Sequence, residues 1–114
     1  MFRECTSLVN APSLPATTLE YHCYGEMFYG CTSLTTSPVL PATTLVHECY
    51  YYMFYNCSSL NNVTSYANDI SSGTEYTLMW LSNVAATGTF HNLGSATYPR
   101  NGSGIPTGWT EVKN

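Results

Sequence analysis

Five cysteines carry the most reactive side chains of this sequence, and their spacing limits the chemistry they could do. Cys5, Cys31 and Cys57 are 26 residues apart, and the same interval separates Cys23 from Cys49. An odd number of cysteines does not make a complete set of disulfides. Closed zinc sites normally contain Cys-x-x-Cys or His-x-x-x-His pairs, and the sequence has neither. We therefore predict buried free thiols, because unpaired cysteine behaves as a small apolar residue.

The histidines and acidic residues do not form a catalytic pattern either. His22, His47 and His91 occupy unrelated positions, and Asp69 is the only aspartate. A hydrolytic triad needs a nucleophile beside a base that an acid orients, and the sequence contains no Gly-x-Ser-x-Gly turn. We expect no enzyme, no metal site and no cofactor.

Composition excludes two classes of partner. Only 10 of the 114 residues are charged, and the polar surface must come from 16 threonines, 12 serines, 9 asparagines and 10 tyrosines. The net charge is −4 and the three basic residues are scattered, so the basic patch that nucleic acid requires is missing. No apolar run approaches the ~20 residues of a membrane span, and no signal peptide pattern opens the chain. We expect neither nucleic acid binding nor membrane insertion.

A repeat of 26 residues organises the chain. The octet Met-Phe-Arg-Glu-Cys-Thr-Ser-Leu at residues 1–8 recurs with few changes at 27–34 and 53–60, and residues 5–19 and 31–45 are identical at 11 of 15 positions. A unit this short cannot enclose its own core, so neighbouring units must stack on one another.

Apolar spacing predicts a helix in each unit. Leu45, Cys49, Met53 and Cys57 follow one another at intervals of four, which is typical of one face of a helix covering 43–55. Glycine and asparagine tolerate the left-handed backbone at a helix end. Gly30 and Asn56 stand at the end of this segment in successive units, whereas the first unit has Glu4 there.

The remainder of each unit predicts one short strand. The Thr- and Ser-rich segment 31–37 contains Leu34 and stops before Pro38, which fits a position beyond the strand. In the third unit the sequence diverges after Leu60, but residues 62–64 are still expected to form a strand. One strand and one helix per unit predict an α/β fold, a short leucine-rich-repeat solenoid with a parallel sheet on one side and helices on the other.

Two segments carry a family resemblance. Met-Phe-x-x-Cys-Thr-Ser-Leu and Leu-Pro-Ala-Thr-Thr-Leu resemble the BspA-like leucine-rich repeats of surface proteins from gut Bacteroides and their relatives. Residues 80–90 and 104–110 are similar to the segments that close such arrays. The resemblance implies a location at the cell surface or outside the cell and a role in adhesion, with host proteins or other cells as partners.

The chain reads as a single domain with two regions. Residues 1–66 are expected to form an N-terminally truncated repeat array, because the chain opens partway through a unit. Residues 67–114 are expected to form a C-terminal cap. Within it we predict a short helix at 77–81, a strand at 87–90, a loop at 92–108, and an edge strand or a crossing segment at 109–112.

Tyrosines are the first set of candidate binding residues. Tyr50, Tyr51 and Tyr52 lie in the expected helix, and tyrosine offers a large contact area at low entropic cost. The alternative is that they pack between neighbouring helices with their hydroxyls at the surface.

The expected sheet supplies the second set, an uncharged ladder of hydroxyls and amides. Its members are Thr35, Thr36, Asn61 and Asn62. Such a face could bind a glycan or an extended peptide, or it could simply be solvated.

These observations favour a non-catalytic binding or adhesion module that recognises a protein or a glycan. The alternative is a structural or virion-associated module that assembles, or associates with itself, through the uncapped N-terminal edge of its repeats.

Overall fold

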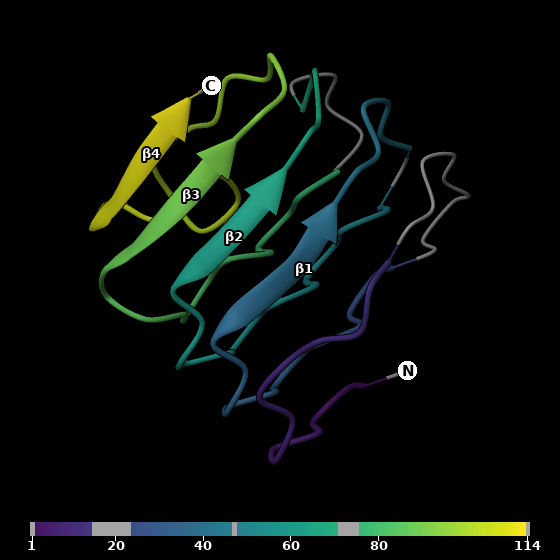
Figure 1. Cartoon of the computed structure of the whole chain (residues 1–114), viewed down its shortest axis with the longest axis vertical. Coiled ribbons are helices and arrows are strands. Elements are labelled where there is room, and N and C mark those ends of the chain that lie inside the picture. Colours follow the sequence, from purple (N-terminus) through teal and green to yellow (C-terminus); the bar gives the residue numbers. More distant parts are fainter. Residues whose placement is uncertain (1, 15–23, 47, 71–75, 114) are drawn as a thin grey trace.

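Four parallel strands form one sheet in a computed structural model that describes residues 2–14, 24–46, 48–70 and 76–113. The strands lie side by side in chain order (Figure 1). Their bounds are β1 (Thr36–Leu40), β2 (Asn62–Ser65), β3 (Gly88–Asn92) and β4 (Trp109–Lys113). Asn10 pairs with Thr36 through a single parallel bridge, so the first repeat lies against the free side of β1.

The predicted α/β leucine-rich-repeat solenoid with a helical layer is wrong. The residues that the structure describes contain no helix, and the segments expected to be helical, 43–55 and 77–81, consist mainly of consecutive tight turns there. Each turn closes with a bond between residues three apart, such as the 3.1 Å bond from the Met53 N–H to the Tyr50 carbonyl. We call residues 2–8, 24–31, 48–57 and 76–83 the turn layer; it lies behind the sheet (Figure 1).

Left-handed backbone at regular intervals explains why a helix cannot form. Glu48, Tyr52 and Asn56 have φ angles of 57°, 52° and 64°, so every fourth residue reverses the hand that a helix would need. Gly30 and Glu4, which share a repeat position with Asn56, are also left-handed, at 74° and 60°. The interval of four that suggested a helix is therefore the period of linked turns.

Backbone hydrogen bonds in the turn layer alternate between two directions. The N–H groups of Tyr52 and Phe54 donate to carbonyls of the next repeat, at Leu78 (2.9 Å) and Trp80 (3.0 Å). The N–H groups between them stay within their own turn, as that of Met53 does. Both kinds of bond satisfy buried backbone groups, and the alternation ties each repeat to its neighbour without a helix.

The sheet differs from the prediction in its first strand. The strand expected at 31–37 is displaced to β1, which contains Pro38 at a bulge between Thr36 and Val39. Proline has no N–H for the ladder and is tolerated at a bulge, and the Thr64 N–H opposite reaches the Ser37 hydroxyl at 3.4 Å. The other strands predicted in this region, at 62–64 and 87–90, are confirmed as β2 and β3. For the segment 109–112 the sequence allowed an edge strand or a crossing segment, and the structure shows the edge strand, β4.

The core lies between the sheet and the turn layer and contains columns of stacked aromatic rings. The rings of Phe2, Phe28 and Phe54 stack with centroids 5.6 Å apart at both steps. A second stack runs through Tyr24, Tyr50, Trp80 and Tyr98, with centroid separations of 6.3, 5.8 and 6.2 Å. The columns join successive repeats into one apolar interior.

A C-terminal segment covers the last turns. The Met79 N–H donates to the Ser103 hydroxyl, the Leu81 N–H to the Gly102 carbonyl and the Trp80 indole N–H to the Gly104 carbonyl, each at 2.9 Å. In the other repeats the equivalent backbone N–H groups donate to carbonyls of the next repeat. Here Ser103 and Gly102 supply the acceptors for Met79 and Leu81 instead.

Candidate functional site

The outer face of the sheet carries a row of uncharged polar side chains. Thr36, Asn62, Thr89 and Thr110 are register partners on the four strands, so they lie directly beside one another. Adjacent strands are about 4.8 Å apart, which makes the row a closely spaced series of hydroxyl and amide groups.

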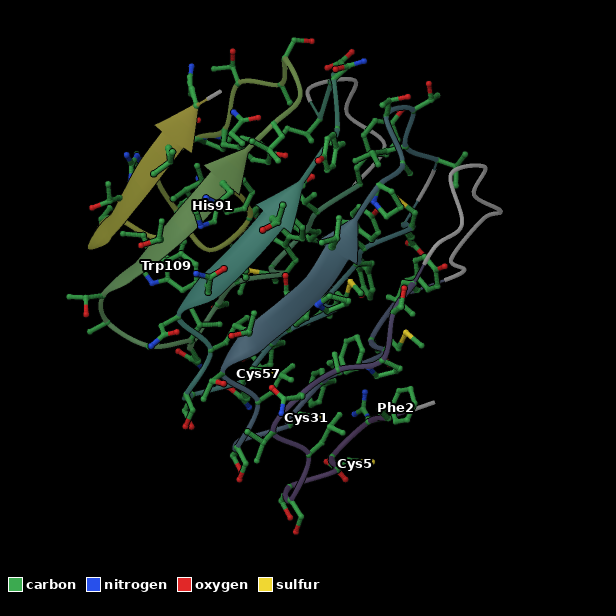
Figure 2. The ribbon with its side chains drawn as sticks, viewed as in Figure 1. Phe2, Cys5, Cys31, Cys57, His91 and Trp109 are labelled. Atoms are coloured by element: carbon green, nitrogen blue, oxygen red, sulfur yellow. The ribbon has the colours of Figure 1, made fainter. Side chains whose placement is uncertain are left out.

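A second row runs parallel to the first. Val39, Thr64, His91 and Val112 are register partners, and the two valines are among the most exposed large apolar residues described, at 52% and 41%. Val63 and Phe90, which alternate with these positions on β2 and β3, are fully buried, so the two rows face away from the core. We call these eight residues the outer sheet face, and none of them carries a fixed charge. Figure 2 labels His91 on β3 within this face.

The residues predicted on the sheet side are brought together only in part. Thr36 and Asn62 belong to the outer sheet face, whereas Thr35 and Asn61 precede the strands and are linked by a 3.0 Å bond from the Asn61 N–H to the Thr35 carbonyl. Sequence reasoning missed the rest of the face, which consists of Val39 on β1, Thr64 on β2 and the members on β3 and β4. The alternation of polar and apolar residues in Asn-Val-Thr and Thr-Phe-His is a signal that could have found its members on β2 and β3, whereas Thr-Glu-Val on β4 lacks this alternation.

The three candidate tyrosines separate into different environments. Tyr50 is only 1% exposed and its ring is stacked between those of Tyr24 and Trp80, so it contributes to the core and does not offer a surface for a ligand. Tyr51 and Tyr52 are partly exposed, with ring centroids 4.4 Å apart.

Tyr29 and Tyr55 complete a group that we call the tyrosine cluster, with Tyr51 and Tyr52. The Tyr55 ring stacks on Tyr29 at 5.1 Å and tilts against Tyr52 at 5.2 Å. Arg3 lies over the other face of Tyr29, 3.9 Å from its centroid, and forms a 2.8 Å ion pair with Glu26. An exposed pair of this kind contributes on the order of 1 kcal/mol or less, but it neutralises the Arg3 charge at the cluster.

Cys31 and Cys57 lie inside the molecule, in surroundings that lower the reactivity of their thiols. The Cys31 thiol donates to the Phe2 carbonyl at 2.8 Å and the Cys57 thiol to the Phe28 carbonyl at 2.9 Å (Figure 2). Burial raises the pKa of both thiols, that of Cys57 to about 12, and a protonated thiol is a poor nucleophile. The four described cysteines are free, and Cys31, Cys49 and Cys57 are buried as predicted, whereas Cys5 is only partly buried. Cys23 lies outside the described residues.

Metal-binding groups do not gather in the part of the chain that the structure describes. No three His, Cys, Asp or Glu residues come together there. His91 lies on the outer sheet face, whereas His22 and His47 fall outside the described residues. Across the same described ranges, no helix is long and apolar enough to cross a membrane.

Comparison with known proteins adds no relative to this picture. No family model, no curated protein and no solved structure matches the chain.

Proposed function

We propose that the chain is a non-catalytic adhesion module, exposed at a cell surface or outside the cell, that binds another protein through the outer sheet face. The observation that carries this proposal is the pair of adjacent uncharged rows across four hydrogen-bonded strands, with Val39 and Val112 exposed at the ends of the second row. The resemblance to BspA-like repeats agrees with such a role.

The chemistry of the face suits a protein ligand better than a charged one. Covering the valines gains about 25 cal/mol for each Å² of apolar surface removed from water. The hydroxyls and amides beside them can pair with the ligand's polar groups, which would otherwise lose their hydrogen bonds to water. The sheet holds all eight side chains on regular structure, so little conformational entropy is lost on binding.

A direct test measures binding of the purified chain to immobilised fibronectin, laminin and collagen. Thr64 lies at the centre of the face, on β2, so Thr64→Arg places a charge there. We expect this variant to lose at least tenfold in affinity for the bound protein, since an unpaired charge would be desolvated. The matched control is Thr97→Arg, at an exposed position away from the strands, which should bind normally.

Three results would overturn the proposal. The first is no binding to any of the three proteins, and the second is equal binding by Thr64→Arg and the wild type. The third is binding to glycan chains of these proteins alone, shown by loss of the signal after enzymatic deglycosylation. Light scattering of the free chain checks whether a second copy already occupies the face.

A further inference from the structure

One column of the turn layer changes abruptly from large to small side chains. Arg3, Tyr29 and Tyr55 stack in the first three repeats, with Arg3 3.9 Å from the Tyr29 centroid and the two rings 5.1 Å apart. The equivalent position of the next repeat is Ser82, and Gly102 follows it.

Contacts on both sides of Ser82 establish this alignment. The Asn56 N–H donates to the Ser82 carbonyl at 3.0 Å, and the Asn83 side-chain amide donates to that of Asn56 at 2.9 Å. A Cβ built on Gly102 would lie 3.1 Å from the Ser82 Cβ. The repeat that follows Tyr55 therefore supplies a hydroxymethyl group where a third ring would continue the stack.

The Tyr55 ring consequently has two different faces. One face is covered by Tyr29, and the opposite face is turned toward Ser82, with Tyr52 tilted beside it at 5.2 Å. The side chain is partly exposed. A group that took the place of the third ring would have the thickness of one ring, because the rings of this column are spaced at 5.1 Å.

We propose that the face of Tyr55 turned toward Ser82 binds the ring of a neutral hexopyranose sugar. The electron-rich face of an aromatic ring attracts the weakly positive C–H groups on one side of a pyranose. Ser82 and Asn83 stand beside this face, and Asn83 is exposed, so sugar hydroxyls can reach its amide and the serine hydroxyl. The ring stack and these polar groups together provide the apolar surface and the few oriented hydrogen bonds typical of a small-molecule site.

Charge favours a neutral sugar over an anionic one. Arg3 is the cation of this column, and it is paired with Glu26 at the far end of the stack, on the other side of Tyr29. The chain carries a net charge of −4, which repels acidic polysaccharides.

The decisive variant is Ser82→Tyr, which adds the missing ring. It should occupy the position of the sugar and extend the Tyr29–Tyr55 stack without loss of thermal stability. Tyr55→Leu removes the aromatic face, and Tyr66→Leu is the matched control at a tyrosine that is 38% exposed and outside the turn layer.

The probes are immobilised neutral oligosaccharides built from glucose, galactose or N-acetylglucosamine, with heparin as the anionic comparison. We expect the wild type and Tyr66→Leu to bind at least one neutral oligosaccharide and not heparin, and both other variants to lose at least tenfold. No binding by the wild type, tighter binding to heparin, or full binding by Ser82→Tyr would overturn the inference. Should Tyr55→Leu fail to fold, Ser82→Tyr still decides the outcome.

This site is independent of the outer sheet face, and the two proposals fail separately. Thr64→Arg tests binding to the enzymatically deglycosylated proteins and should leave sugar binding intact, whereas Ser82→Tyr should abolish sugar binding and leave binding to the deglycosylated proteins intact.

Discussion

Gly30 and Glu4 occupy equivalent positions in successive repeats, and both have left-handed backbones. Residues with a Cβ adopt this conformation at a cost of about 1–2 kcal/mol, which glycine avoids and asparagine reduces. The same column holds Asn56 and Asn83, with φ angles of 64° and 62°. The residue types at this position therefore follow mainly from backbone geometry, and Glu4 is the exception that bears the larger cost.

The substitution Gly30→Ala should lower the free energy of unfolding by about 1 kcal/mol or more, because φ is 74° at this position. The added Cβ would also meet the Glu4 Cγ at 3.1 Å. Urea denaturation measures the change. Among the described glycines, Gly30 is the one with a positive φ, so Gly25→Ala is the matched control. Equal effects at the two positions would contradict this explanation.

At the scale of elements, the sequence predicted two of the strands well and the turn layer badly. Val63 and Phe90 each stand between polar residues, and the segments around them, 62–64 and 87–90, were predicted correctly as the strands β2 and β3. Pro38 misled the prediction of β1, because a bulge admits a proline that a regular strand would exclude. An interval of four fits both a helix and a chain of linked turns, and only the backbone angles at residues such as Tyr52 separate them.

The candidate sites were predictable to a similar extent. Asn62 could be placed on the expected sheet because it shares a repeat position with Thr36, whereas its neighbours Thr89 and Thr110 come from segments that have lost the repeat motif. Tyr50 and Tyr51 are adjacent and chemically identical in the sequence. Only the turn geometry makes Tyr50 part of the core and leaves Tyr51 partly exposed.

The turn layer predicts an alternating pattern of amide exchange. The Phe28 and Phe54 N–H groups bond to the next repeat at 3.0 Å, so they should exchange as slowly as the Val63 amide of β2. The Tyr55 N–H bonds within its own turn at 3.3 Å and should exchange faster, because a turn opens locally. Hydrogen exchange followed by NMR measures these rates. Uniform protection of residues 48–57, or a helical circular dichroism spectrum, would contradict the turn layer.

At the scale of the whole molecule, stability rests on a core that joins all repeats to the C-terminal segment. Tyr98 ends the stack that begins at Tyr24 and passes through Tyr50 and Trp80, and its hydroxyl donates to the Ser65 hydroxyl at 3.2 Å. Burial, with a smaller effect from the Glu111 charge, raises the pKa of Tyr98 from 10.0 to about 12.

This core should make the protein sensitive to alkali. The pKa of Tyr98 is raised to about 12, and burial raises that of Cys57 from 9.0 to about 12. Between the ordinary pKa values of these two groups and about pH 12, the unfolded chain binds fewer protons than the folded one. The stability that they contribute is therefore complete below about pH 9 and falls as the pH rises toward 12. Each group contributes a slope of up to about 1.4 kcal/mol per pH unit.

Denaturant melts from pH 7 to pH 12 measure this dependence. The variant Tyr98→Phe should be less stable than the wild type at pH 7, because it lacks the hydrogen bond to Ser65. It should lose less stability between pH 10 and 12, since one titrating group has gone. A wild type as stable at pH 11 as at pH 8 would refute the titration of these buried groups.

The alternating bonds of the turn layer also give that layer an electrical direction. Every bond of the turn layer that crosses from one repeat to the next, such as Phe2 to Met27, Phe28 to Met53 and Phe54 to Trp80, has its N–H on the earlier repeat and its carbonyl on the later one. The peptide dipoles of these bonds therefore add along the stack, as they do along a helix axis. The positive end lies toward Ser103 and Gly102, whose oxygens accept the last N–H groups of the turn layer. The turn layer thus contributes a dipole along the stack that arises from the backbone alone, whereas sheet-side bonds such as Asn61 to Thr35 and Tyr66 to Leu40 point the opposite way.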